Sequence, residues 1–460
     1  MTVLRPWVSL TFAILIVLFL ILEVFAHPLV ELALKLGVMV TIGLCFFMAK
    51  RTAQGLALLF LGTGIFLLTS TGMGWRGFIN SFGEMVFVVA FFSILPIVAL
   101  PIRVIGYDQH IMSIIVRHAN TVKKEYGFIL ALSYFYGIFL NLAAVPMSFR
   151  SLQSLLARKN VHDKERFLFY SMSQGFNAPL LWTPFSGMLG VIVVSFDVSW
   201  LKLLPTLLVV SLSALILSFV LYWPWTKANV IESEAMATPD VGAGSGWGGL
   251  IELLAVVGVL LLLVLVLESL FGLGLIISII FLTFPFTLAW VALKGRLVAF
   301  KTSLVQYFGV QLPTMASIYM VFLSAGFFVG AMQLSGYDAL ISQHVSYGLT
   351  AIPNFAVYAL LPWVVIVTSY MGIHPIVTLV LLTGAIQWDA LGLQTELLAM
   401  AYLVGGVSTF LMSPFSGTIG LMRTFTQRGY PAIILPNLGT VVIFHSVVWL
   451  AIQTRYWLGA

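Results

Sequence analysis

Runs of about 20 apolar residues recur from one end of the chain to the other, separated by short polar stretches. As a helix, a run of that length crosses the roughly 30 Å hydrocarbon core of a membrane. The first run, Trp7 to Ala26, follows Arg5 and has the features of a secretory signal. Because further apolar runs follow it at once, we predict that it is retained as a first transmembrane helix.

Two of the later runs are interrupted by nearly the same five residues. Residues 183–187 read TPFSG, and residues 413–417 read SPFSG, 230 positions later. Four more pairs recur in matching order in the two halves: LVELALKLGV with LIELLAVVGV, GYDQHI with GYDALI, Gly175 with Gly405, and LLPTLLVV with ILPNLGTV. Such self-similarity predicts a duplicated unit.

We therefore divide the chain into four segments. Residues 1–27 form an extra N-terminal helix, residues 28–225 a first repeat unit and residues 249–460 a second. The stretch at 226–248 is polar and rich in Gly and Ala, which is typical of a flexible linker.

The first repeat unit contains both full crossings and shorter pieces. Its apolar segments at 29–49, 54–71, 83–104, 165–197 and 200–224 predict five crossings. The segment at 126–157 is interrupted by NLAAVP, and each piece of about 15 residues is too short to span, which indicates a re-entrant hairpin. An odd number of crossings inverts the second unit relative to the first. The predicted fold is therefore an all-α polytopic membrane protein of about 11 transmembrane helices and two re-entrant hairpins.

A polar stretch before each hairpin predicts a helix that lies along the membrane interface. Residues 106–127 place Ile111, Ile114 and Ile115 on one side and polar residues on the other. Asp108, and Asp338 in the second repeat, are the expected N-caps of these helices.

The distribution of positive charge indicates the orientation. Only Arg76, Lys202 and Arg455 of the 22 Lys and Arg residues fall on the side opposite the N-terminus, and Lys35 falls inside a span. By the positive-inside rule, the N-terminus and the linker are cytoplasmic, and the C-terminus is external or periplasmic. We expect a multi-pass protein of the cell inner membrane. Its net charge of +6 reflects this orientation and does not indicate a nucleic-acid partner.

The composition excludes several other classes of protein. The chain is 61% hydrophobic and 8% charged, with a mean hydropathy of +1.08, which no soluble domain has. Cys45, the only cysteine, excludes an internal disulfide and a Cys-rich metal site. There is no GxxxxGK[ST] motif for ATP hydrolysis, and the spans lack the clustered His and acids that an embedded enzyme needs. We predict neither an enzyme nor a metal or cofactor site, apart from a coupling ion, Na⁺ or H⁺.

The interruptions form two matched pairs, TPFSG with SPFSG and NLAAVP with SYMGIHP. Irregular backbone at membrane depth is tolerated only where it is buried in protein or lines a cavity. Free N–H groups at half-helix ends favour anions, and free carbonyls favour cations. The alternative is a pair of Pro kinks that only bend packed helices. The predicted substrate- or ion-binding residues are Asn141, Thr183, Ser186, Gly187, Thr368, Ser369, His374, Ser413, Ser416, Gly417 and Thr418.

In its architecture and in the positions of these breaks, the chain resembles the ion transporter superfamily of secondary carriers over nearly its whole length. That group includes the divalent anion/Na⁺ symporters and the large membrane subunits of tripartite periplasmic (TRAP) transporters. Of the symporters' Ser-Asn-Thr hairpin signature, the chain keeps Asn141 in the first tip and Thr368 and Ser369 in the second. MGIHPIVTLVLL also looks like the corresponding tip of the TRAP subunit.

The resemblance implies ion-coupled transport of a small anion by an elevator mechanism. In that superfamily, hairpins and unwound helices form a transport domain that moves against a scaffold, usually in a homodimer embedded in membrane lipid. The alternative is a large membrane subunit that works with a periplasmic binding protein.

Three sets of polar residues have more than one interpretation. His374 could contact the anion, carry a coupling proton or cap the backbone of its tip. Glu31 and Glu252 begin equivalent helices and could bind a cation or be interfacial carboxylates, with Lys35 one turn after Glu31. Gln174 and Asn177 could face the site or bond to a neighbouring helix.

Overall fold

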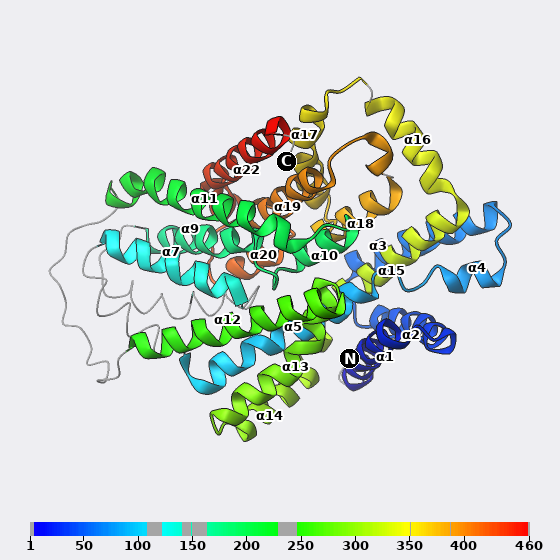
Figure 1. Ribbon diagram of the computed structural model, residues 1–460, viewed down its shortest axis with the longest axis horizontal. Helices are drawn as coiled ribbons and strands as arrows, with labels where there is room; N and C mark the ends of the chain where they lie inside the picture. The colour runs from blue at the N-terminus through cyan, green and yellow to red at the C-terminus, as the bar shows by residue number, and fades with distance from the viewer. Residues whose placement is uncertain are drawn as a thin grey trace. The chain divides into compact units, whose positions relative to one another are not determined.

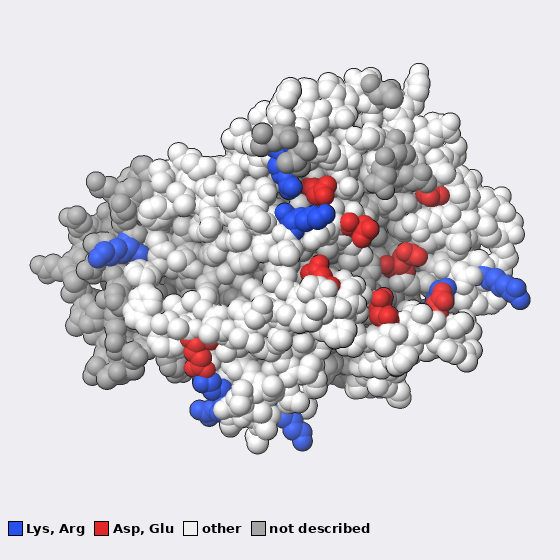
Figure 2. All heavy atoms as spheres, in the orientation of Figure 1, with Lys and Arg blue, Asp and Glu red and all other residues white. Residues whose placement is uncertain are grey.

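The computed structural model describes residues 4–107, 122–139, 149, 163–228, 246–349, 351–386 and 388–458. Across these ranges the regular structure is helical, without strands (Figure 1). Ten of the helices described there are long and apolar enough to cross a membrane. Charged side chains are sparse on the face drawn in Figure 2. The fold is that of an all-α polytopic membrane protein, as the sequence predicts.

The chain forms two compact units, and each takes segments from both halves of the sequence. Unit 1 comprises Met1–Val104, Glu268–Pro353 and Ile376–Gln394, and unit 2 comprises Ile105–Leu267, Asn354–Pro375 and Thr395–Ala460. Each predicted repeat therefore contributes to both compact units. Most of the predicted linker lies outside the described residues.

In unit 1, two glycines of one helix allow it to pack closely against the loop at residues 81–85. Its helices are α1 (Arg5–Phe25), α2 (Pro28–Phe46), α3 (Arg51–Ser70), α4 (Trp75–Asn80), α5 (Val86–Ile105), α13 (Leu275–Leu293), α14 (Leu297–Gln306), η3 (Tyr307–Gln311), η4 (Leu312–Met315), α15 (Ala316–Ser335), α16 (Tyr337–Leu349), α18 (Pro375–Ala385) and η5 (Trp388–Leu391). A Cβ at Gly330 of α15 would lie 2.5 Å from the carbonyl oxygen of Ser81, and one at Gly326 would lie 2.9 Å from the nitrogen of Met85. Small residues four apart allow this approach.

Unit 2 contains both broken helices. Its helices are α7 (Val122–Phe139), α9 (Lys164–Asn177), η2 (Ala178–Leu181), α10 (Gly187–Ser195), α11 (Trp200–Ala228), most of α12 (Gly246–Phe271), α17 (Asn354–Tyr370), α19 (Thr395–Met412), α20 (Gly417–Arg423), α21 (Tyr430–Ile434), η6 (Leu435–Asn437) and α22 (Leu438–Leu458). The predicted crossing at 165–197 is divided among α9, η2 and α10, each too short to span alone.

The glycines at matching positions in the two repeats have the same role in unit 2. A Cβ at Gly175 of α9 would lie 2.4 Å from the carbonyl oxygen of Leu130 in α7. A Cβ at Gly405 of α19 would lie 2.7 Å from the Cα of Pro362 in α17. In each repeat, therefore, the first half of the broken helix crosses the hairpin helix with backbone against backbone.

The second predicted hairpin is divided between the units at its tip. α17 and the tip belong to unit 2, whereas residues from Ile376 onward belong to unit 1. The resemblance implies a whole hairpin in one transport domain, whereas the division into compact units places α18 apart from α17. The reason is packing, because Gly384 of α18 lies so close to α15 that a Cβ would be 2.5 Å from Val329.

The second interfacial segment is helical, as predicted. It forms α16, where Asp338 lies in the first turn and not at the N-cap position. A carboxylate in the first turn still interacts favourably with the N-terminal end of the helix dipole. Asp108 and most of the first interfacial segment lie outside the described residues.

Candidate functional site

Both helices are broken where the sequence predicts. η2 ends before Thr183, and Ser186 is the N-cap of α10. α19 ends before Ser413, and Ser416 is the N-cap of α20. In each case the cap hydroxyl accepts from the N–H three residues on, at 3.5 Å in the first break and 3.2 Å in the second. Gly187 and Gly417 are the first residues of the restarted helices.

The first hydroxyl of each motif ties its break to the hairpin helix of the same repeat. Thr183 Oγ1 donates to the carbonyl oxygen of Ile138, near the end of α7, at 2.8 Å. Ser413 Oγ donates to the carbonyl oxygen of Ser369, near the end of α17, at 3.0 Å. The two bonds span 45 and 44 residues, so the same contact recurs in both repeats.

The two broken helices pack side by side in opposite directions. Ser173 in α9 lies 3.5 Å from the sulfur of Met422 in α20. Met188 in α10 lies so close to α19 that a Cβ at Gly406 would be 2.5 Å from its Cε. The first half of each broken helix thus contacts the second half of the other, which brings the two breaks together inside unit 2.

The tip between α17 and α18 lies against the second break. The His374 ring meets Phe410 of α19 edge to face, with ring centroids 6.5 Å apart. Tyr370 donates its hydroxyl to the carbonyl oxygen of Met412 at 2.9 Å. Gly372 takes a φ of +90°, which favours glycine, and a Cβ there would reach Phe415. Predicted site residues of the second tip and the second break are therefore neighbours.

The second break is more open than the first. Phe185 of the first motif is 1% exposed, whereas Phe415 of the second is 62% exposed.

Two other predicted site residues, Thr368 and Asn141, belong to the hairpin tips. The Thr368 hydroxyl donates to the carbonyl oxygens of Val364 and Val365 in its own helix, at 2.9 and 3.0 Å. Asn141, the predicted ligand of the first tip, lies outside the described residues.

Four backbone carbonyls at the breaks accept a hydrogen bond from a side chain. The four pairs are Ser211 with the carbonyl of Ala178 at 2.7 Å, Trp200 with that of Trp182 at 2.9 Å, Asn437 with that of Leu411 at 3.3 Å and Tyr370 with that of Met412 at 2.9 Å. A cation at these carbonyls would have to use their second lone pairs. Among the first-turn N–H groups, those of Leu189 and Ile419 donate to the cap hydroxyls. The other N–H groups in the first turns of α10 and α20 have no carbonyl acceptor in their own helices.

Several fully buried polar atoms near the breaks have no hydrogen-bond partner in the described part of the chain. They are Thr418 Oγ1 in the first turn of α20, and Asn177 Oδ1 and Gln174 Nε2 at the end of α9. Gln174 also accepts from the Tyr126 hydroxyl of α7 at 2.5 Å, so its oxygen makes the predicted bond to a neighbouring helix. Buried polar groups are normally paired, so these atoms have bonding capacity left for a ligand or water.

Glu31 and Glu252, the carboxylates at matching positions in the two repeats, each contact a neighbouring side chain. Glu31 forms an ion pair with Lys35 one turn later at 2.5 Å. Glu252 accepts from the Tyr107 hydroxyl at 2.9 Å. Both contacts match the interpretation of these residues as structural carboxylates.

An ion cluster that sequence analysis missed joins the two broken helices at their outer ends. Arg428, after α20, makes a two-pronged contact with Asp163 at 2.7 and 2.8 Å and lies 3.2 Å from Glu165. Thr426 donates to Glu165 at 2.6 Å. Asp163 also caps α9. No sequence signal reveals these contacts, because the partners are 265 and 261 residues apart.

The fold of this chain is similar to that of two solved transporters. The Alcanivorax borkumensis YdaH transporter, whose structure has an unusual topology, aligns with a TM-score of 0.60 at 17% identity, over 88% of this chain and 98% of its own. The second structure is MtrF of Neisseria gonorrhoeae, whose structure and function illuminate a class of antimetabolite efflux pumps. It aligns with a TM-score of 0.57 at 13% identity, over 87% of this chain and 96% of its own. No family model and no curated protein matches the chain. At these identities the likeness establishes a shared fold.

Proposed function

We propose that this chain is a secondary active transporter that moves a small anionic solute across the membrane by ion coupling. The observation that carries the proposal is the repeated bond from break to hairpin, Thr183 to Ile138 and Ser413 to Ser369. A kink that only bends a helix needs no such partner, and still less the same partner in both repeats. The fold shared with two transporters supports the same conclusion.

An anion suits this site better than a cation. The first-turn N–H groups of α10 and α20 offer positive partial charge at the paired breaks. Four of the carbonyls at the breaks, which would favour a cation, already accept a side-chain donor. Thr418 adds a buried hydroxyl without a described partner. The coupling ion, Na⁺ or H⁺, would bind at the same breaks.

We propose an elevator mechanism in which unit 2 carries the substrate and unit 1 is the scaffold. Both broken helices, α17 and the second tip belong to unit 2. Pro375 is the last residue of a unit 2 segment, and the next residue, Ile376, belongs to unit 1. We therefore propose that the tip also acts as a hinge. The transporter would act as a homodimer, in keeping with the resemblance to the ion transporter superfamily.

A ligand screen followed by counterflow tests this function. The purified protein is heated with succinate, citrate, benzoate, phosphate or sulfate, with and without Na⁺ and at several pH values, because a ligand of the folded state raises the melting midpoint. The proposal expects at least one anion to stabilise the protein and to exchange across proteoliposomes that contain it. If none of the stabilising anions exchanges, the chain is not a carrier of this class.

The alternative is the membrane subunit of a binding-protein-dependent transporter. It rests on the likeness of MGIHPIVTLVLL to the TRAP tip. Exchange by the purified chain alone would exclude it, whereas exchange that needs an added periplasmic binding protein would establish it.

Removing either cap hydroxyl should impair transport. We expect Ser186→Ala and Ser416→Ala each to lower counterflow about ten-fold or more, the cost of losing a hydrogen bond to a charged ligand. Loss of the cap itself costs only about 1 kcal/mol of stability. Initial counterflow rates and melting midpoints measure the two effects.

Two controls separate the ligand role from the structural one. Ser→Thr at either position keeps the hydroxyl and should restore transport. Ser171→Ala removes a buried hydroxyl of α9 that bonds to its own helix at 2.6 Å, and should leave transport unchanged. Wild-type rates in both cap variants would favour the kink interpretation.

Single cysteines should report the predicted orientation. Met73, after α3, is 42% exposed and should react only with a reagent added outside. Lys294, after α13, is exposed and should react only from the cytoplasmic side. The native Cys45 is buried and gives little background. Labelling of Met73→Cys and Lys294→Cys from one and the same side would refute the predicted crossing count.

A further inference from the structure

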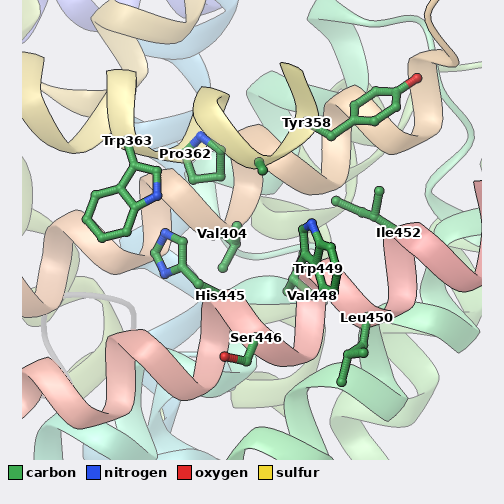
Figure 3. Close-up of a pocket in the computed structure, with 11 residues that line it drawn as sticks. Tyr358, Pro362, Trp363, Val404, His445, Ser446, Val448, Trp449, Leu450 and Ile452 are labelled. Carbon is green, nitrogen blue, oxygen red and sulfur yellow. The ribbon is translucent and has the colours of Figure 1, made fainter. Parts of the chain in front are cut away.

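Unit 2 contains a pocket that is separate from the paired breaks. It has a volume of about 400 Å³ and lies between α17, α19 and α22 (Figure 3). Pro362 and Trp363 of α17, Val404 of α19, and His445 and Trp449 of α22 form much of its wall. Pockets of this size with aromatic and aliphatic walls and a few polar groups are typical of small-molecule sites.

The pocket favours an uncharged ligand. No Asp, Glu, Lys or Arg is among the 11 described residues that line it. A charged molecule would therefore lose its hydration without gaining a partner. This separates the pocket from the breaks, where we propose that an anion binds.

His445 gives the pocket one directional polar group. Its Nδ1 lies 2.8 Å from the carbonyl oxygen of Val441 one turn earlier, so Nδ1 carries the proton in that bond. Nε2 is then a pure acceptor, and it is buried without a hydrogen-bond partner among the described residues. A buried acceptor without a donor costs free energy that a bound hydroxyl would recover.

Trp363 packs against the ring that carries this acceptor. Its indole stacks on the His445 ring, with centroids 5.1 Å apart and planes at 27° (Figure 3). Trp363 is 47% exposed, so one side of the residue is free of contacts with the described residues. The indole rings of Trp363 and Trp449 offer faces for a second aromatic ring.

We propose that this pocket, the α17–α22 pocket, binds a neutral lipophilic phenol. The hydroxyl donates to His445 Nε2 after Trp363 turns aside, and the ring packs among the indoles. Pro362, in the same wall, is the residue clamped against Gly405, so the ligand contacts the helix crossing described above. The occupant is thus defined by three properties: no charge, one aromatic ring and one hydrogen-bond donor.

Photolabelling in lipid nanodiscs tests the proposal. The probe is an alkylphenol that carries a diazirine, and its methyl ether is the matched control with the same shape but no donor. In the wild-type protein we expect saturable phenol labelling of α17 and α22 peptides, at least ten-fold stronger than labelling by the ether. Equal labelling by phenol and ether would overturn the proposal and indicate a pocket filled by a lipid acyl chain.

Two variants test the residues. His445→Phe keeps the stacked ring but removes the acceptor, and should lower phenol labelling to the level of the ether. Ala359→Phe fills the pocket from α17 and should abolish saturable labelling by both probes. Phenol labelling of either variant at wild-type strength would contradict the proposal. The comparison of the two probes on wild-type protein decides the question even if a variant fails to fold.

Discussion

Gly175→Ala and Gly405→Ala are each expected to destabilise the protein strongly. A methyl group at these positions would lie 2.4 Å from the carbonyl oxygen of Leu130 and 2.7 Å from the Cα of Pro362. Both obstacles are backbone, so relief requires the helices to separate. Overpacking costs about 1–3 kcal/mol and occasionally more, and we expect the upper end of that range. The melting midpoint should fall on the order of 5 °C or more.

Gly420→Ala is the matched control. Gly420 lies in α20 of the same unit, and a Cβ there would meet nothing within 4 Å. Alanine is about 1 kcal/mol better than glycine inside a helix, so this variant should be neutral or more stable. If Gly175→Ala and Gly420→Ala melt alike, the close crossing of α7 and α9 is not needed for stability.

His374→Gln is expected to raise the apparent KM for the anion about ten-fold or more. This expectation rests on the proposed function and on the position of His374 beside the second break. An imidazole N–H would add a hydrogen bond to the attraction of the half-helix N-termini for an anion, and a hydrogen bond to a charged group is worth about 1.5–3 kcal/mol. Glutamine keeps a donor but lacks the ring that packs against Phe410.

Two transport assays distinguish ligand contact from proton coupling. Under ligand contact, the KM rises both in accumulation driven by a pH gradient and in counterflow. Under proton coupling, accumulation is abolished and counterflow persists. His344→Gln, an exposed histidine of α16 that bonds to its own helix, is the control and should change neither assay. Unchanged kinetics in His374→Gln would leave this histidine as a backbone cap.

The sequence predicts the local structure of the site well, because local structure follows local chemistry. Pro, Ser and Gly inside an apolar run cannot continue a helix, so TPFSG and SPFSG identify both breaks. Ser186 and Ser416 become N-caps because a Ser hydroxyl accepts from the first turn of a restarting helix. The match of Gly175 with Gly405 is a sign of the repeat alone, and only the structure shows that both lie at equivalent close crossings.

What the sequence does not reveal is the contact between distant segments. The sequence predicts that Thr183 and Ser413 bind a substrate or ion, yet in the structure each hydroxyl donates to a carbonyl of a hairpin helix. The sequence also predicts that the carbonyls at the breaks favour a cation, yet Trp200 and Asn437 already donate to two of them. The division of the second hairpin between two units also escapes detection, because it depends on the packing of Gly384 against Val329.

The interleaving of the two units has a consequence for biosynthesis. Ser173 and Met422 are 249 residues apart, and Asp163 and Arg428 are 265 apart. At about 5–20 residues per second, the ribosome delivers the later partner on the order of ten to fifty seconds after the earlier one. During that interval α9 and α10 are already made, and their buried hydroxyls and amides lack the helices that will cover them. The contacts that complete unit 2 therefore form only after its last helices have been synthesised.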